Sequence, residues 1–326
     1  MSAETSLSMT AQGGIVLIDK PSGMTSHDVV ARMRRRLGTK RVGHAGTLDP
    51  MATGLLVVLF GEGTKLEPYL SISDKAYEAV IAFGRSTDTL DAEGQTIAEE
   101  APSAELVREL CDLEADLERA APLFQAALEQ ERARREQIPP AFSAIKVDGV
   151  RSHRLARKGE LLDLPARNVR ILELALRRAS SAKPETLPSV ALYLLVTKGY
   201  YVRSFARDLG EALGCSSHLA GLRRVAAGSF EIARAAALDC SEAELDAHKI
   251  AIVDVAKRVM PWLALSADEE RDARHGKTLS IEAGRLAAEA GSIALTNETG
   301  SQLVAIAGLT ASSETTRSLV VSRGFV

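Results

Sequence analysis

The sequence GHAGTLDPMATG, at residues 43–54, contains three glycines and one proline within twelve residues. This density of helix and strand breakers predicts a loop without any regular element. The apolar run that follows at 55–60 predicts a buried strand. Because loops held by a rigid scaffold often carry binding and catalytic side chains, we expect functional residues in this loop.

Regular elements are predicted on both sides of the loop. Before it, an apolar run at 15–19 predicts a strand, and residues 25–37 predict a helix. The helix signals are a capping-box spacing, apolar residues four apart and a glycine stop, at Thr25, Asp28, Val29, Met33, Leu37 and Gly38. After the loop, strands are predicted at 76–83 and 190–197, and a helix with one apolar face at 200–213.

Strands and helices alternate without the regular rhythm of a doubly wound sheet, so we expect an α+β fold with a mixed sheet. Residues 104–135 predict an exposed helical excursion, because they are charged and rich in alanine. After 261 the chain predicts a short helix and then strands at 292–295, 303–307 and 318–321. We therefore expect a tail at 1–10, a main domain at 11–260 with an acidic helical insert at 94–135, and a small domain at 261–326.

Composition limits the class of protein. The chain has 326 residues, 46% hydrophobic and 25% charged, which excludes collagen-like, low-complexity and wholly disordered chains. No apolar run approaches the roughly 18 residues of a membrane span, and the first residues lack the features of a signal peptide. Three scattered cysteines and six histidines without metal-ligand spacing predict no metal site. We expect a soluble, cytoplasmic protein with no membrane contact.

Charge is distributed unevenly along the chain. The net charge of −3 argues against a nucleic-acid partner. Residues 132–235, however, hold 19 basic and nine acidic side chains, whereas residues 94–131 hold two basic and ten acidic ones. The basic stretch indicates a polyanionic partner, and the alternative is a solvated helix face rich in arginine.

Two local motifs have ordinary explanations. Asp49 followed by Pro50 is a common helix start, with Asp at the N-cap and Pro at the first position. Gly54 then leaves space for barely one turn, which weakens that explanation. The run GEGTK at 61–65 lacks the spacing of a phosphate-binding loop.

Several strings together resemble, in chain order, the TruB family of tRNA pseudouridine synthases: KPSGMTS (20–26), GHAGTLDP (43–50), KAYEA (75–79) followed by GRSTDTLD (84–91), IPPAFSAIK (138–146) and KGYYVR (198–203). The resemblance covers nearly the whole chain. Residues 104–135 depart from it, because they are longer than the usual connection and lack the family's F-x-G signature before Gln137. Phe142 stands where some members have tyrosine.

The resemblance implies that uridine at position 55 in the T loop of tRNA is converted to pseudouridine by a monomer that uses no cofactor and no metal. It also implies a pseudouridine synthase fold, with a mainly antiparallel sheet flanked by helices, and a PUA-like RNA-binding domain at 261–326. The alternative is a tRNA-binding or folding-helper protein with catalysis secondary. A carboxylate at Asp49 argues against a pure binder, because it would repel phosphates. An unrelated hydrolase is a weaker alternative, because the sequence shows no recognisable Ser/His/Asp or metal-binding constellation.

The family's functional residues match positions of this sequence. Asp49 matches the catalytic carboxylate, which acts in its ionised form. Arg203 matches its arginine partner, whose positive charge favours that form. Tyr77 matches the tyrosine that stacks on the target base and handles a proton. Without the resemblance, Tyr77 would be interpreted as an aromatic residue of a sheet core.

Further matched positions concern binding and support. His44 matches the residue that fills the space left when the target base is extruded from its stack. Tyr201 and Leu222 match positions that line the pocket, whereas we interpret Lys20 and Pro21 as structural support for the loop. Taken alone, a histidine in a loop is more often a hydrogen-bonding side chain.

Overall fold

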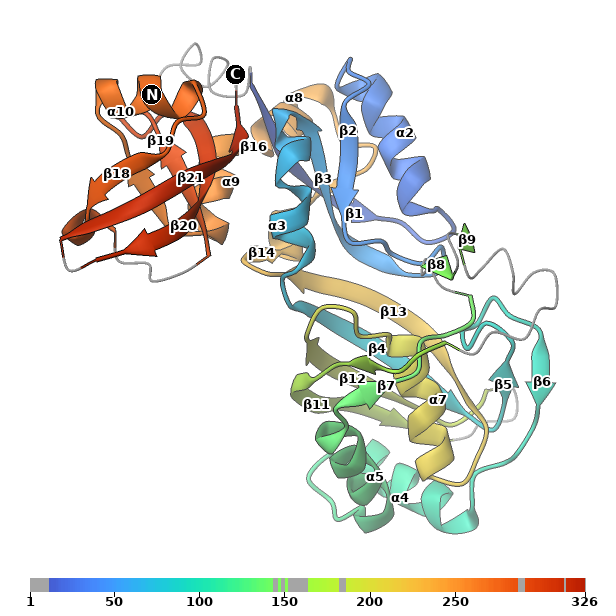
Figure 1. The fold of residues 1–326 in the computed structure, drawn as a ribbon. Coiled ribbons are helices and arrows are strands. Elements are labelled where there is room, and N and C mark those ends of the chain that lie inside the picture. The colour runs from blue at the N-terminus through green and yellow to red at the C-terminus, as the bar shows by residue number, and fades with distance from the viewer. Residues whose placement is uncertain are drawn as a thin grey trace. The chain divides into compact units, whose positions relative to one another are not determined.

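The computed structural model describes residues 12–142, 146–147, 150–151, 164–181, 186–286, 291–313 and 315–325 (Figure 1). The chain divides into two compact units. The first unit contains residues 1–49, 55–72 and 228–326, and the second contains residues 50–54 and 73–227. The tail predicted at 1–10 lies outside the described residues, and the domain boundary at 261 stays a prediction.

A mixed sheet begins the first unit. Strand β1 (Gly13–Lys20) lies between β3 (Thr53–Gly61) and β15 (Ala236–Ala237), and it runs parallel to β15. Strand β16 (Lys249–Ala251) also pairs with β1, antiparallel, and β2 (Val42–Ala45) pairs with β3. The remaining elements of this part are α2 (Ser26–Arg36), η1 (Glu62–Leu66), α3 (Glu67–Ser71), β14 (Phe230–Glu231), η2 (Ile232–Arg234), α8 (Glu242–Ala247) and α9 (Ile252–Val259).

Helix α2 begins as its sequence predicts. The Thr25 hydroxyl accepts a hydrogen bond from the Asp28 amide at 3.1 Å, and the Asp28 carboxylate accepts one from the Thr25 amide at 2.9 Å. This reciprocal capping box satisfies two amide groups that the first helical turn leaves without partners. The predicted helix at 25–37 is confirmed.

A second sheet completes the first unit. Its strand order is β17 (Trp262–Ala264), β19 (Ser292–Thr296), β20 (Leu303–Ser312), β21 (Thr316–Gly324) and β18 (Leu279–Glu282). Helix α10 (Ala267–Arg274) and η3 (Ala283–Arg285) complete this part. Its core contains Ile293, Leu295, Val304 and Leu319. The β-rich character predicted after 261 is confirmed.

The second unit contains a four-stranded antiparallel section. The order is β11 (Ile171–Ser180), β12 (Ser189–Val196), β4 (Lys75–Phe83) and β13 (Ser217–Ala227). Helices α4 (Ala104–Ala115), α5 (Pro122–Ala133) and α7 (Val202–Ala212) share one apolar core with these strands (Figure 1). Short strand pairs complete the unit: β5 (Ser86–Thr87) with β6 (Thr96–Ala98), β7 (Glu136–Gln137) with β10 (Arg167–Asn168), and β8 (Lys146–Val147) with β9 (Val150–Arg151). The predicted α+β class with a mixed, mainly antiparallel sheet is confirmed.

The acidic segment folds differently from the expectation. Residues 104–135 are helical as predicted, but the helices pack against β11 and do not form an exposed excursion. Leu106, Leu110 and Phe124 are fully buried in the core of the unit. Their helical spacing provides an apolar stripe on each helix, which the prediction overlooked beside the many charges.

The glycine-rich stretch is only partly a loop. Residues 43–45 belong to β2, whose backbone pairs with residues 57–59 of β3. Thr53 and Gly54 begin β3 and pair with β13. The loop is therefore confined to 46–52, and the wider prediction was wrong. Gly54 has a φ of +98°, and a Cβ there would lie 2.3 Å from the Arg224 carbonyl oxygen. A glycine is thus required where β3 pairs in parallel with β13.

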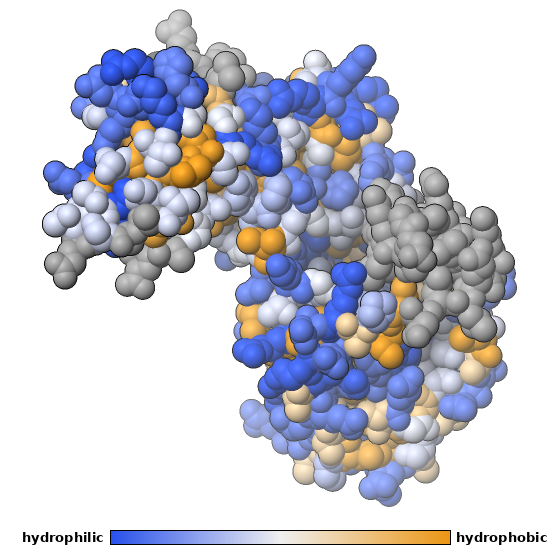
Figure 2. All heavy atoms as spheres, in the orientation of Figure 1, coloured by the Kyte–Doolittle hydropathy of each residue, from blue (hydrophilic) through white to orange (hydrophobic). Residues whose placement is uncertain are grey.

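The exterior of the protein is mainly hydrophilic on the face drawn in Figure 2. Hydrophilic residues cover most of this face, and apolar residues between them gather in smaller patches. None of the helices in the described part of the chain is long and apolar enough to cross a bilayer.

Candidate active site

Two predicted site residues lie on one face of the sheet in the second unit. In the register of β4 with β13, Tyr77 is opposite Arg224 and Ala79 is opposite Leu222. Because side chains alternate along a strand, these four point to the same side of the sheet. Tyr77 and Leu222 are half-buried and pack against the core that contains α7. We call this side, which α4, α5 and α7 cover, the covered face.

The start of α7 brings two more predicted residues to the second unit's core. Tyr201 is the N-cap of α7, with extended backbone angles, and Arg203 lies in its first turn. Helix α7 packs against β13 and β4, the strands that carry Leu222 and Tyr77. Four of the predicted residues therefore belong to one side of one sheet.

Arg203 is buried and held by main-chain oxygens. Its Nη1 donates to the Thr89 carbonyl at 3.0 Å, and its Nη2 donates to the Phe142 carbonyl at 2.9 Å. Asp91 adds an ion pair, with 3.7 Å between its Oδ2 and Nη1. Burial of a guanidinium without such partners is costly in free energy. These contacts offset that cost and hold the Arg203 side chain in one orientation.

Asp91 is a site residue that the sequence interpretation missed. Its Oδ1 accepts hydrogen bonds from the Thr89 hydroxyl at 2.6 Å and from the Glu93 amide at 3.1 Å. These bonds fix the carboxylate that pairs with Arg203. The string GRSTDTLD, which carries the resemblance, ends on this residue and was the available signal.

Positive charge gathers on the covered face beside Tyr77. Lys75 lies two residues before Tyr77 on β4, and Arg224 lies opposite it, and both are buried. Burial and, after it, the positive charge of Arg224 lower the pKa of Lys75 to about 8, although the Asp74 carboxylate opposes the shift. An electron-rich or anionic substrate is favoured in such surroundings.

In the first unit, Lys20 and Pro21 lie at the turn after β1. The Lys20 side chain is fully buried, and its Nζ donates to the Pro21 carbonyl at 2.9 Å and to the Met24 carbonyl at 2.7 Å. These bonds close the turn that precedes α2. The supporting role proposed for the two residues stays a prediction.

His44 and Asp49 belong to β2 and to the loop after it. The His44 ring stands edge-on to His27, with 5.5 Å between ring centroids. Asp49 is half-buried and follows Leu48, whose amide donates to the Ser26 hydroxyl at 2.9 Å and whose carbonyl accepts from it at 3.2 Å. The start of α2 thereby fixes the backbone next to Asp49.

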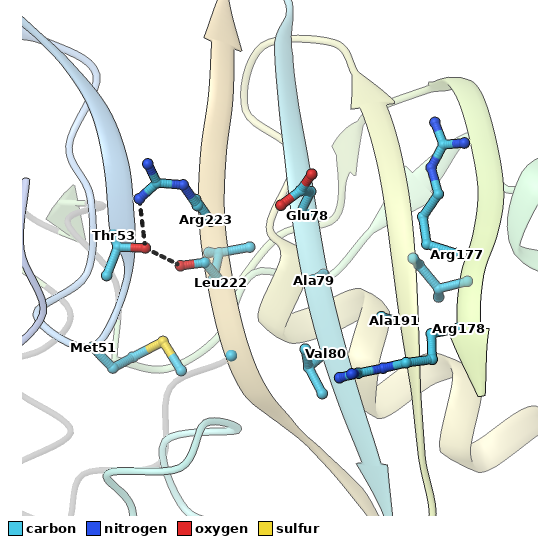
Figure 3. A pocket seen from close by; sticks show the side chains of 12 residues that line it. Met51, Thr53, Glu78, Ala79, Val80, Arg177, Arg178, Ala191, Leu222 and Arg223 are labelled. Atoms are coloured by element: carbon cyan, nitrogen blue, oxygen red, sulfur yellow. Dashed lines mark hydrogen bonds between the residues drawn. The ribbon is translucent and has the colours of Figure 1, made fainter. Parts of the chain in front are cut away.

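The opposite side of the sheet, which we call the open face, has a separate hollow of about 520 Å³. Glu78, Arg177 and Arg223 project from three strands over a floor of small residues that includes Ala191 and Val80, while α7 lies behind the strands (Figure 3). Arg223 donates weakly to the Thr53 hydroxyl, at 3.5 Å. Alternation along β4 places Tyr77 on the other side of the sheet from this hollow. Leu222 on β13, by contrast, also lines the hollow (Figure 3).

Taken together, the covered face combines the aromatic ring of Tyr77, the buried Arg203 and two further buried basic side chains, Lys75 and Arg224. Such a set can stack on a base, orient a carboxylate or phosphate and stabilise negative charge. Within the described residues, no three His, Cys, Asp or Glu side chains are grouped closely enough to hold a metal ion.

Comparison with known proteins gives related sequences over most of the chain. The model of the N-terminal domain of TruB family pseudouridylate synthases matches residues 34–202, and that of the tRNA pseudouridylate synthase B C-terminal domain matches residues 203–251. The tRNA pseudouridine synthase B of Opitutus terrae is 42% identical over 248 residues, which cover 76% of this chain and 92% of that protein. The enzyme of the same description from Thermobifida fusca is 41% identical over 269 residues, covering 82% and 86%.

Solved structures share the fold at lower identity. The Cbf5–Nop10–Gar1 complex contains a chain that matches with a TM-score of 0.66 and 20% identity, covering 98% of this chain and 87% of that one. The H/ACA RNP bound to a substrate RNA containing 2′-deoxyuridine gives a TM-score of 0.65 and 19% identity, with the same coverage. The predicted fold is confirmed by these likenesses.

Proposed function

The chain belongs to the TruB family of pseudouridylate synthases, and from this premise we propose that it converts uridine to pseudouridine at position 55 in the T loop of tRNA. The observation that carries the proposal is the family match over residues 34–202, which spans Asp49 and Tyr77 and ends beside the buried Arg203. The basic excess of residues 132–235 supports a polyanionic substrate.

The proposed reaction is an isomerisation. The N1–C1′ bond of uridine breaks and a C5–C1′ bond forms, while C5 loses a proton and N1 gains one. Atoms and electrons balance without an oxidant or reductant. The protein must therefore hold the base through its rotation, stabilise charge and move protons, tasks that amino-acid side chains can perform.

We assign the roles as follows. Asp49 is the carboxylate that assists cleavage of the glycosidic bond, as a nucleophile or a base. Arg203 favours the ionised form of that carboxylate. Tyr77 stacks on the extruded uracil and handles the proton, because a phenol has an apolar face and a polar tip. Tyr201 and Leu222 line the pocket for the base.

We assign His44 and residues 261–326 to the binding of tRNA and not to the chemical step. A uridine in a folded T loop is stacked, so its extrusion costs a few kcal/mol. A side chain that occupies the vacated space offsets part of this cost, and we assign that role to His44. Residues 261–326 hold another part of the tRNA.

The test is direct. Unmodified tRNA transcript is incubated with the protein, and pseudouridine is located by mass spectrometry of nuclease fragments. We expect one pseudouridine, at position 55, and none at that position in a matched transcript with cytidine there. Modification at other positions only would contradict the assigned target, and tight tRNA binding without any pseudouridine would favour a binding or folding-helper function.

A further inference from the structure

The segment at 136–142 holds the start of α7 through Gln137. Gln137 lies in β7 and is only 2% exposed. Its Nε2 donates to the Tyr201 carbonyl at 3.1 Å, and the Tyr201 amide donates to its Oε1 at 2.9 Å. Both polar atoms of one side-chain amide thus bind both backbone groups of one residue, as an adjacent strand would do.

This arrangement differs from an ordinary helix cap. Tyr201 is the N-cap of α7, but its side chain makes no capping hydrogen bond. Its carbonyl also accepts the first helical bond, from the Phe205 amide at 3.1 Å. Gln137 thus satisfies the amide of the N-cap residue itself and adds a second donor to its carbonyl, which fixes the backbone at the point where α7 begins.

Neighbouring bonds connect the same segment to the next residues of α7. The Ser204 hydroxyl donates to the Ile138 carbonyl at 2.8 Å, and Arg203 Nη2 donates to the Phe142 carbonyl at 2.9 Å. Three residues in the first turn of α7 are therefore fixed by residues 137–142. Among these contacts, only Gln137 uses a side chain of the segment, so it can be removed without changing the segment's backbone.

We propose that Gln137 is a positioning residue, whose amide fixes the backbone of Tyr201 so that Tyr201 and Arg203 keep the orientations that the reaction requires. The inference rests on the proposed function, in which these two residues line the pocket and favour the ionised carboxylate. Gln137 itself acts through Tyr201. A displacement of about 1 Å at such a support is sufficient to cost a large part of the rate.

The test compares Gln137→Met with Ser217→Ala. The first change keeps the volume and removes both bonds to Tyr201. The second removes a bond of 2.6 Å from a buried hydroxyl to the Ala206 carbonyl, farther along the same helix. We expect both variants to unfold at a lower temperature, but only Gln137→Met to lower the single-turnover rate at saturating enzyme, by about 10- to 100-fold, with the Kd for tRNA within threefold of wild type.

A third variant and a second measurement keep the test decisive. Gln137→Glu retains the acceptor for the Tyr201 amide but sets a second oxygen against the Tyr201 carbonyl, so its rate should also fall below that of wild type. Hydrogen exchange of a peptide covering 199–207 should be at least tenfold faster in Gln137→Met than in wild type or Ser217→Ala. Hydrogen exchange can be measured whether or not the protein is active. If the wild-type protein formed no pseudouridine, the proposed function would be refuted, while the exchange rates would still test whether Gln137 fixes Tyr201. Unchanged exchange, or a rate no lower than that of Ser217→Ala, would overturn the positioning role.

Discussion

The two faces of the sheet in the second unit differ in how their charged groups are held. On the covered side, Arg203 has two hydrogen bonds to carbonyls and an ion pair with Asp91. On the open face, Arg177 lies 5.1 Å from the centre of the Tyr193 ring. Arg223 on the same face has a bond of 3.5 Å to Thr53 (Figure 3). The covered side thus holds a buried arginine from α7 with several partners, whereas the open face carries Arg177, which is exposed, and Arg223, which is half-buried.

The way in which these arginines are held indicates which face of the sheet is suited to catalysis. A catalytic group must keep one orientation, whereas ion pairs between exposed charges contribute little and are screened by salt. A hollow with arginines around it is therefore a weaker indication of an active site than a buried arginine with three fixed partners. We therefore propose that the reaction takes place on the covered face and that the open face takes no part in it.

The largest effect is expected for Asp49→Asn. The amide keeps the volume but cannot act as an anionic nucleophile or base, so we expect the single-turnover rate to fall by about 1000-fold or more. The Kd for tRNA, measured by filter binding, should stay within threefold. Residual turnover within tenfold of wild type would contradict the assigned role.

A matched pair of arginines compares the two faces. Arg203→Met should lower the single-turnover rate by about 100-fold, whereas Arg223→Met on the open face should change it by less than about threefold. Arg203→Lys is the control for folding, because lysine keeps the buried positive charge that Asp91 pairs with. It loses only the planar guanidinium that binds two carbonyl oxygens. Equal effects at the two positions would remove the distinction between the faces.

Asp91→Asn should have a smaller effect than loss of the arginine. The substitution removes the charge of the ion pair but leaves the bonds from Arg203 to the Thr89 and Phe142 carbonyls. We expect a rate about 10- to 30-fold below wild type, with little change in tRNA affinity. A loss as large as that in Arg203→Met would mean that Asp91 acts on the substrate rather than through Arg203.

Sequence patterns predicted part of this arrangement. The helix at 25–37 and the strand at 76–83 followed from capping and β-propensity, which are local properties. Tyr77 and Arg203 came from motif resemblance alone. The contacts of Gln137 could not be foreseen, because its partners are backbone groups distant in sequence, which leave no signature. The ion pair of Asp91 with Arg203 could not be foreseen either, because only the fold brings these two distant residues together.

The open face should tolerate loss of its charges. We expect Arg177→Gln combined with Arg178→Gln to leave the single-turnover rate within twofold and to weaken tRNA binding by no more than about threefold at 0.15 M salt. A fluorescence titration across a salt series measures this. A tenfold weakening with a much shallower salt dependence would show that RNA contacts this face.

The acidic segment should give the smallest effect, provided that its buried carboxylate is left intact. Glu109 accepts bonds from the Leu123 and Phe124 amides, at 3.0 and 2.9 Å, and so caps α5. Its replacement would lower the free energy of unfolding by about 1–2 kcal/mol, a loss unrelated to RNA. Glu99, Glu100, Glu105 and Glu118 are exposed instead. Their combined replacement by glutamine should tighten tRNA binding less than twofold at 0.15 M salt, where the Debye length is about 8 Å, and slightly more at low salt.

The contrary hypothesis is that these carboxylates cover a basic surface and compete with RNA. Neutralisation would then tighten binding at every ionic strength. A tightening of tenfold or more at 0.15 M salt, about 1.4 kcal/mol, would establish that competition. The packing of α4 and α5 argues against it, because their apolar sides are already committed to the core and a cover would have to remain free to move.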